Sequence, residues 1–133
     1  MNTIKFRIWN PEEKKMIESG ATPMMLHSFF EYSARFNTQY EMPYQQLTGL
    51  TDKLGKEIYE GDIIRYTFWQ NSPQIGSVIV PVYFCEGGFV VATTNGEPLT
   101  LREAIKISNE ASGLEIIGNT YENPDLLNNF KKI

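Results

Sequence analysis

Apolar and polar residues alternate at the start of the chain. Residues 4–9 read Ile-Lys-Phe-Arg-Ile-Trp, so Ile4, Phe6 and Ile8 share one face of an extended segment. The turn-forming sequence Asn-Pro-Glu-Glu follows at residues 10–13, and a second short apolar run comes directly after it. This pattern predicts an N-terminal β-hairpin over residues 4–17.

The spacing changes in residues 20–43. Met25, Phe29, Tyr32 and Phe36 recur at intervals that place them on one face of a helix. The aromatic residues of the same segment also favour a strand. Both interpretations stay open, and the spacing favours the helix.

A β-branched and aromatic series occupies residues 58–69, which is typical of strands. Before it, Asp52 and Gly55 hold the first and fourth positions of a segment with the preferences of a type I turn. Gly61 interrupts the series and predicts a bulge or a sharp bend.

Residues 75–84 predict a further strand, with Val78, Val80 and Val82 on one face. Because Pro81 cannot donate a hydrogen bond to a ladder, we expect this strand to lie at an edge or to be bulged there. A turn follows at residues 86–88, and Asn95-Gly96 is the strongest short hairpin signal in the chain.

Shorter elements complete the pattern. Residues 99–107 fit either a strand or a short helix, and residues 114–117 fit a short strand that ends at Gly118. Asn123 and Pro124 are typical of a helix N-cap and the first helical position, so we expect a helix to about Phe130.

These elements predict a mainly β fold with a minor α component. A length of 133 residues fits one domain, residues 1–133, with a compact β region over residues 44–123 and a less regular segment at 20–43. The aromatic share of 13% supports the β assignment, because aromatic side chains suit pleated, half-buried surfaces.

Charge and cysteine content narrow the class of protein. The net charge is −4, which gives little support to phosphate neutralisation of the kind that nucleic-acid binding requires. Cys85 is the single cysteine, so no intrachain disulfide forms, and its apolar neighbours place it in the core. The N-terminus lacks a signal-peptide pattern and no apolar run is long enough to span a bilayer, so we expect a cytoplasmic protein without membrane contact.

Few residues offer candidate chemistry. His27 is the only histidine and has no metal-ligand spacing around it, and no glycine-rich phosphate loop is present. Glu57, Glu60 and Asp62 cluster around Gly61 and would bind a divalent cation or act as acid and base if they met in a cleft. The simpler interpretation is that Asp62 accepts backbone hydrogen bonds at the bend. We therefore expect no catalytic residue, no metal and no cofactor.

One stretch offers a candidate binding surface, namely Arg65, Tyr66, Phe68 and Trp69. Aromatic side chains on neighbouring strands form a stacking platform in single-strand nucleic-acid binders, where they accompany a positively charged groove. Arg65 is the only arginine in these strands, so roles in the core or in a subunit contact are favoured.

Three motifs resemble the YopX-like family of phage and prophage proteins. They are residues 4–9, residues 47–64 (Leu-Thr-Gly-Leu-Thr-Asp-Lys-Leu-Gly-Lys-Glu-Ile-Tyr-Glu-Gly-Asp-Ile-Ile) and residues 116–127 (Ile-Ile-Gly-Asn-Thr-Tyr-Glu-Asn-Pro-Asp-Leu-Leu). The resemblance implies a mainly β fold with a small barrel-like core, encoded by a bacteriophage or prophage and acting inside a bacterial cell. It transfers no catalytic residue. The distinctive motif residues read as corners of the fold: Gly55, Gly61, Asp62, Gly118 and Asn119.

Together these observations predict a non-enzymatic accessory protein that binds another macromolecule, a protein rather than a nucleic acid. A homo-oligomer is an open possibility, through the edge near Pro81. The alternatives are a nucleic-acid-binding small-barrel module, which requires lysines gathered beside Arg65, and a small enzyme built on Glu57, Glu60 and Asp62.

Overall fold

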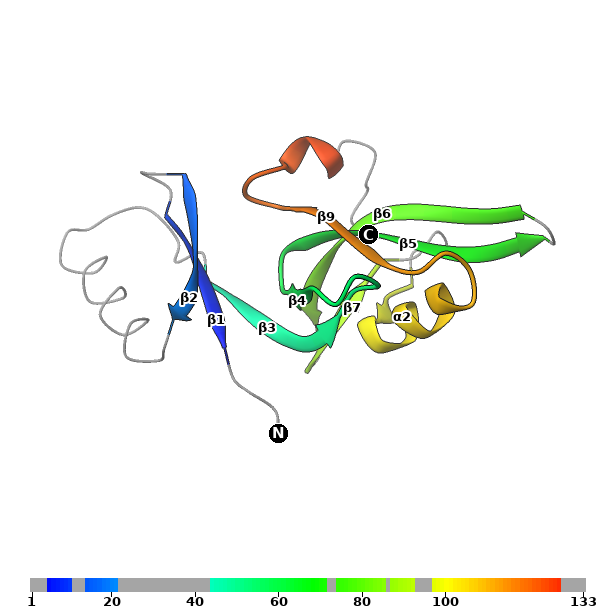
Figure 1. Ribbon diagram of the computed structural model, residues 1–133, viewed down its shortest axis with the longest axis horizontal. Coiled ribbons are helices and arrows are strands. Elements are labelled where there is room, and N and C mark those ends of the chain that lie inside the picture. Colours follow the sequence, from blue (N-terminus) through cyan, green and yellow to red (C-terminus); the bar gives the residue numbers. More distant parts are fainter. Residues whose placement is uncertain are drawn as a thin grey trace. The chain divides into compact units, whose positions relative to one another are not determined.

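The computed structural model describes residues 5–10, 14–21, 44–71, 74–85, 87–92 and 97–127 (Figure 1). Its contacts divide the chain into two compact units, residues 1–47 and 48–133. The segment predicted as helix or strand lies outside the described residues apart from its first two positions. The same holds for His27 and for the Asn95-Gly96 turn.

The first unit contains the predicted N-terminal hairpin. β1 (Phe6–Asn10) pairs antiparallel with β2 (Lys15–Ala21). On its other side β1 pairs with the first residues of β3 (Tyr44–Thr51). Arg7 is buried here, and its Nε donates a hydrogen bond to Oε1 of Gln45 in the facing strand. A buried guanidinium needs such a partner, because an unsatisfied polar group in the interior costs free energy.

The second unit is built on a five-stranded antiparallel sheet in the order β8-β7-β6-β5-β9. Its strands are β5 (Asp62–Asn71), β6 (Gln74–Cys85), β7 (Gly88–Val91), β8 (Leu99–Thr100) and β9 (Glu115–Asn119). The short strand β4 (Glu57–Tyr59) lies beside the later part of β3, where the Thr48 hydroxyl donates to the Ile58 carbonyl. The mainly β prediction with a small curled core is confirmed.

Helix α2 (Leu101–Asn109) completes the core of this unit. Thr100 caps its N-terminus by accepting a hydrogen bond from the Glu103 N–H, at 3.2 Å. The core cluster combines the inner face of the sheet with the apolar face of α2: Ile58, Ile64, Tyr66, Val80, Val82, Val91, Leu101, Ala104 and Leu114. Residues 99–107, which fit a strand or a helix by sequence, therefore form a two-residue strand followed by a helix.

The predicted C-terminal helix lies only partly within the described residues. Pro124–Leu127 form one 3-10 turn, η1, and residues beyond 127 are not described. Asn123 stands at the predicted N-cap position, but its Oδ1 accepts a hydrogen bond from the Asn119 N–H. The side chain therefore ties the turn back to the end of β9.

Pro81 does not mark β6 as an outer strand of the sheet, because β6 lies between β5 and β7. The register explains how the sheet tolerates a proline there. Pro81 lies opposite Ile63 of β5, whereas pairing with β7 begins only at Val82. The nitrogen that cannot donate thus lies just beyond the end of β7, on a side without a described partner strand.

Candidate functional site

Asp52 organises the turn between β3 and β4. Its Oδ1 accepts hydrogen bonds from the N–H groups of Leu54 and Lys56, each at 2.9 Å. Its Oδ2 accepts one from the Ile116 N–H of β9 at 3.1 Å. The Gly55 N–H donates to the Asp52 carbonyl, and Gly55 has a φ of 83°, which a residue without a side chain adopts without strain. The motif at residues 52–56 is therefore a corner that joins a turn to a strand distant in sequence.

Gly61 and Asp62 form a second corner, between β4 and β5. Gly61 has a φ of 86°, and Oδ2 of buried Asp62 accepts a hydrogen bond from the Tyr59 N–H at 2.7 Å. The backbone of Gly61 also bridges two other segments, since its N–H donates to the Val82 carbonyl and its carbonyl accepts from the Thr120 N–H.

Gly118 and Asn119 form a third corner at the end of β9. Oδ1 of Asn119 accepts hydrogen bonds from the N–H groups of Tyr121 and Glu122. A Cβ on Gly118 would lie 2.6 Å from Oδ1 of Asn123, closer than such atoms pack. The absence of a side chain at 118 is what lets Asn123 fold back against the strand.

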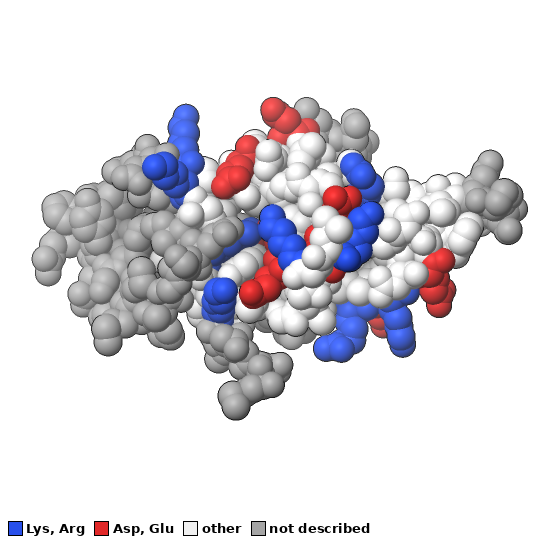
Figure 2. Space-filling view, in the orientation of Figure 1, with Lys and Arg blue, Asp and Glu red and all other residues white. Residues whose placement is uncertain are grey.

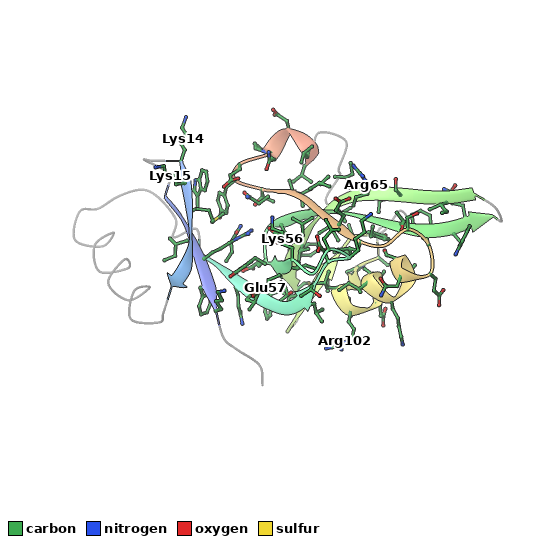
Figure 3. The ribbon with its side chains drawn as sticks, viewed as in Figure 1. Lys14, Lys15, Lys56, Glu57, Arg65 and Arg102 are labelled. Carbon is green, nitrogen blue, oxygen red and sulfur yellow. The ribbon has the colours of Figure 1, made fainter. Side chains whose placement is uncertain are left out.

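Glu57 and Asp62 lie in different surroundings. Asp62 is buried and engaged with the Tyr59 backbone, whereas the Glu57 side chain is exposed on the surface (Figure 3). Within the described part of the chain, no group of three or more His, Cys, Asp or Glu side chains is arranged to hold a metal ion.

The four residues of the candidate binding surface divide between the two faces of β5. Tyr66 is buried and Phe68 packs against the core, with their rings 6.0 Å apart. Arg65 and Trp69 point to the other face and are exposed. The division follows from the alternation of side chains along a strand. Tyr66 and Phe68 are therefore core residues, which corrects their place in the predicted surface, and only Arg65 and Trp69 remain available to a partner.

β6 supplies the residues that complete the exposed face. Ile79 lies directly opposite Arg65, and Ile75 lies directly opposite Trp69. The exposed fractions are 50% for Trp69, 43% for Ile75 and 37% for Ile79. We call this group, Arg65, Trp69, Ile75 and Ile79, the outer face of the arm. Ile75 and Ile79 were missed in the sequence because strand pairing, which brings them beside β5, is not visible in a single segment.

The outer face belongs to a two-stranded arm formed by β5 and β6. β9 pairs with β5 only as far as Arg65, and β7 pairs with β6 only from Val82 onwards. The two strands therefore run on together beyond the rest of the sheet (Figure 1).

Beyond Arg65, β5 no longer pairs with β9. There its edge forms hydrogen bonds with the last turn of α2 and with the loop that follows α2. The Thr67 N–H donates to Oγ of buried Ser108 at 3.1 Å. The Thr67 hydroxyl donates to the Gly113 carbonyl and accepts from the Ser112 N–H. Nε1 of Trp69 donates to the Glu110 carbonyl at 2.5 Å. These bonds hold the Trp69 ring in a defined place while half of its surface remains exposed.

The charges around this face are mixed. Arg65 lies opposite Glu115 in β9, and Glu115 forms an ion pair with Lys53 at 3.7 Å. Figure 2 shows acidic and basic side chains close together on the visible face of the second unit. Residues 70–85 carry no charged side chain at all. The arm therefore offers apolar contact area with a single cation at its base, and no continuous basic groove.

No helix among the described residues has the length and apolar character needed to cross a bilayer. Cys85, at the end of β6, is partly buried and free. Next to it, the rings of Phe84 and Phe89 pack edge to face at 5.4 Å.

Comparison with known proteins places the chain in a family. No curated protein matches it. Among solved structures, the crystal structure of protein EF1440 from Enterococcus faecalis is similar, with 26% sequence identity and a TM-score of 0.60. That match covers 96% of this chain and 99% of that chain. The family model described as YopX protein matches residues 5–128, and the chain therefore belongs to the YopX protein family.

Proposed function

We propose that this chain is a non-enzymatic accessory protein of a bacteriophage or prophage, and that it binds another protein inside the host cell. The contact surface is the outer face of the arm. Membership of the YopX protein family supports the phage setting, and the residues that this face exposes support the binding role.

The observation that carries the proposal is the exposure of Trp69, Ile75 and Ile79 on one sheet face, where Trp69 and Ile75 lie directly opposite each other. Single exposed apolar residues are common, but a contiguous group marks an interaction surface. Trp and Arg are also the residues that most often dominate the binding energy of protein interfaces. The hydrogen bond of Trp69 to Glu110 holds the ring in place before a partner arrives, which lowers the entropic cost of binding.

The same surface supports a protein partner better than a nucleic acid. A single-strand binder needs cations along the path of the phosphates. Here Arg65 stands beside Glu115, and the strands beyond it carry no charge.

A photo-crosslinking amino acid at position 69 tests the proposal in the bacterial cell that makes the protein. We expect a discrete adduct whose mass differs from twice 15.3 kDa, the mass of two copies. Position 54 is the matched control, because Leu54 is an apolar side chain with 74% exposure in the turn between β3 and β4.

The adduct should disappear when Ile79 is changed to Asp in the same chain, since a carboxylate in the centre of the face opposes apolar contact. Identical adducts from positions 69 and 54, or no adduct from position 69, would contradict the proposal. An adduct that contains nucleic acid would favour the alternative module.

A further inference from the structure

Part of β6 presents an unpaired edge. β6 pairs with β5 over Gln74–Pro81, but with β7 only over Val82–Cys85. Among the residues that the structure describes, no strand lies beside Gln74–Pro81 on the side away from β5. This edge differs from the outer face, because it offers backbone groups rather than side chains.

The direction of these backbone groups follows from the register. The Val82 carbonyl accepts a hydrogen bond from the Gly61 N–H, at 2.7 Å, so Val82 directs its backbone towards β5. Backbone groups alternate in direction along a strand. Ile75, Ser77 and Ile79 therefore direct their N–H and carbonyl groups outward, to the open side.

Among the described residues, this edge lacks most of the features that prevent two exposed edges from pairing. Proteins protect exposed edges with charged side chains, bulges or covering loops, because an open ladder pairs readily with another strand. The segment 74–81 has no charged residue, and it contains the β-branched residues Ile75, Val78, Ile79 and Val80. A proline at its end, Pro81, is the one protective feature.

We propose that this edge pairs with the same edge of a second copy of the chain. The two β6 strands run antiparallel about a two-fold axis at Ser77. Ser77 then pairs with Ser77 of the second copy, and Ile75 with Ile79 of the second copy. The proposal concerns the arm of the proposed function, but it requires no other partner.

Two prolines select this register. Centred on Ser77, the ladder uses the outward N–H groups of Ile75, Ser77 and Ile79, and by residue count Pro81 falls opposite Pro73 of the second copy. Centring the pair on Gly76 or on Val78 would place Ile79 or Ile75 opposite a proline. In each shifted register, the outward carbonyl of that isoleucine would face a residue without an N–H and would lack a donor.

The side chains also fit a second copy. In this register one row of side chains crosses the joined sheet. It consists of Arg65 and Ile79 of one copy, followed by Ile75 and Trp69 of the second copy. Arg65 of one copy does not lie opposite Arg65 of the other. Like charges directly opposite one another destabilise a sheet, and this register avoids that arrangement. On the inner side, the Phe68 ring fills the space over Gly76, so Val78 of the second copy would pack beside that ring.

One strand pair is small beside an ordinary stable interface, which buries about 1,200–2,000 Å². We therefore expect a reversible dimer that forms at concentrations of about 10–100 μM. Pairing by the edge leaves the outer face uncovered and joins two such faces into one four-stranded surface.

Sedimentation velocity of the full chain from about 5 to 500 μM tests the dimer. We expect the mass to rise from one copy to two. Ser77→Pro removes an N–H that only the dimer uses, and it should weaken association at least about tenfold. Ser77→Ala keeps that N–H and should dimerise as before. A monomer at every concentration, or equal association by both variants, overturns the proposal.

Cysteine pairs test the register without proline in the strand. Facing residues of a hydrogen-bonded antiparallel pair have Cα atoms about 5.5 Å apart, within the range of a disulfide. In a Cys85→Ser background, Ser77→Cys should form an oxidised dimer, whereas Ile79→Cys alone should not. A mixture of Ile75→Cys and Ile79→Cys chains should cross-link. Equal cross-linking of Ser77→Cys and Ile79→Cys alone would overturn the two-fold pairing.

These results are separable from the proposed function. Sedimentation velocity of the purified chain tests the dimer in the absence of any other protein. If the dimer fails, adducts from position 69 still report the partner. If position 69 gives only adducts of two copies, the proposed function fails and the dimer remains.

Discussion

Asp52 connects two parts of the second unit that are far apart in sequence. Asp52 is 7% exposed, and its carboxylate accepts hydrogen bonds from the backbone of its own turn and from Ile116 of β9. Hydrogen bonds to a charged acceptor are stronger than neutral ones, and a buried N–H left without a partner costs free energy.

Asp52→Ala should therefore lower the free energy of unfolding by about 2–4 kcal/mol. Asp52→Asn should cost less, since one oxygen is retained. Urea denaturation at pH 7 measures both, with exposed Thr51→Ala as the control that should change stability by less than about 0.5 kcal/mol. Equal stability of the Asp52→Ala and Thr51→Ala variants would show that this corner does not support the fold.

Tyr66 makes the free energy of unfolding depend on pH in the alkaline range. Burial raises the pKa of its hydroxyl above the ordinary value of about 10. The folded chain then retains this proton where the unfolded chain loses it, so the contribution to stability is complete below pH 10 and is lost as pH rises above it.

The free energy of unfolding should consequently fall more steeply above pH 10 in the wild-type chain than in Tyr66→Phe. Denaturation curves at pH 8, 10 and 11 give the comparison. Below pH 9 the difference between the two chains should be constant. Parallel curves up to pH 11 would show that the Tyr66 hydroxyl ionises as freely in the folded chain as in the unfolded one.

At the scale of elements, α2 is attached to the sheet by side-chain hydrogen bonds as well as by apolar contact. Leu101 and Ala104 enter the core, while Ser108 in the last turn reaches the edge of β5. There its Oγ accepts the Thr67 N–H, which β9 no longer pairs. Ser108 at the end of α2 thus provides the hydrogen-bond acceptor for the Thr67 N–H that a neighbouring strand would otherwise provide.

Ser108→Ala should lower the free energy of unfolding by about 1–3 kcal/mol, because it leaves the buried Thr67 N–H without an acceptor. Ser112→Ala is the matched control. The Ser112 side chain is exposed and contributes its backbone to the same network, so its loss should be nearly neutral. Thermal unfolding followed by circular dichroism separates the two, and equal melting temperatures would contradict the role of Ser108.

For the whole molecule, the balance of charge bears on the choice of partner. The net charge is −4, and within the second unit acidic and basic side chains alternate over the visible surface (Figure 2). Nucleic-acid binding that depends on phosphate neutralisation weakens steeply as salt is added.

We therefore expect no shift of single- or double-stranded DNA or RNA in a gel titration at low salt, up to about 10 μM protein. Arg65→Glu should behave like the wild-type chain in this assay. Binding that falls with added salt, and that Arg65→Glu reduces, would instead support the nucleic-acid-binding module.

The single-domain prediction for residues 1–133 stays a prediction, since the two units are described separately. Family membership was predictable from three local motifs, because each motif is a continuous segment whose turns and caps depend on its own residues. The mainly β class was predictable for a similar reason. Alternation and β-branched content act within a strand, as the hairpin of β1 and β2 shows.

The candidate surface was only half predictable. The sequence by itself determined that residues 58–69, interrupted at Gly61, contain a strand with aromatic side chains on both faces, and that glycine, aspartate and asparagine occupy the corners. Only the tertiary structure decided which face of that strand is covered, because burial depends on α2 and on neighbouring strands distant in sequence. That contact placed Tyr66 and Phe68 in the core and brought Ile75 and Ile79 beside Trp69 and Arg65. Among the described residues, it left residues 74–81 of β6 without a partner strand on the side away from β5.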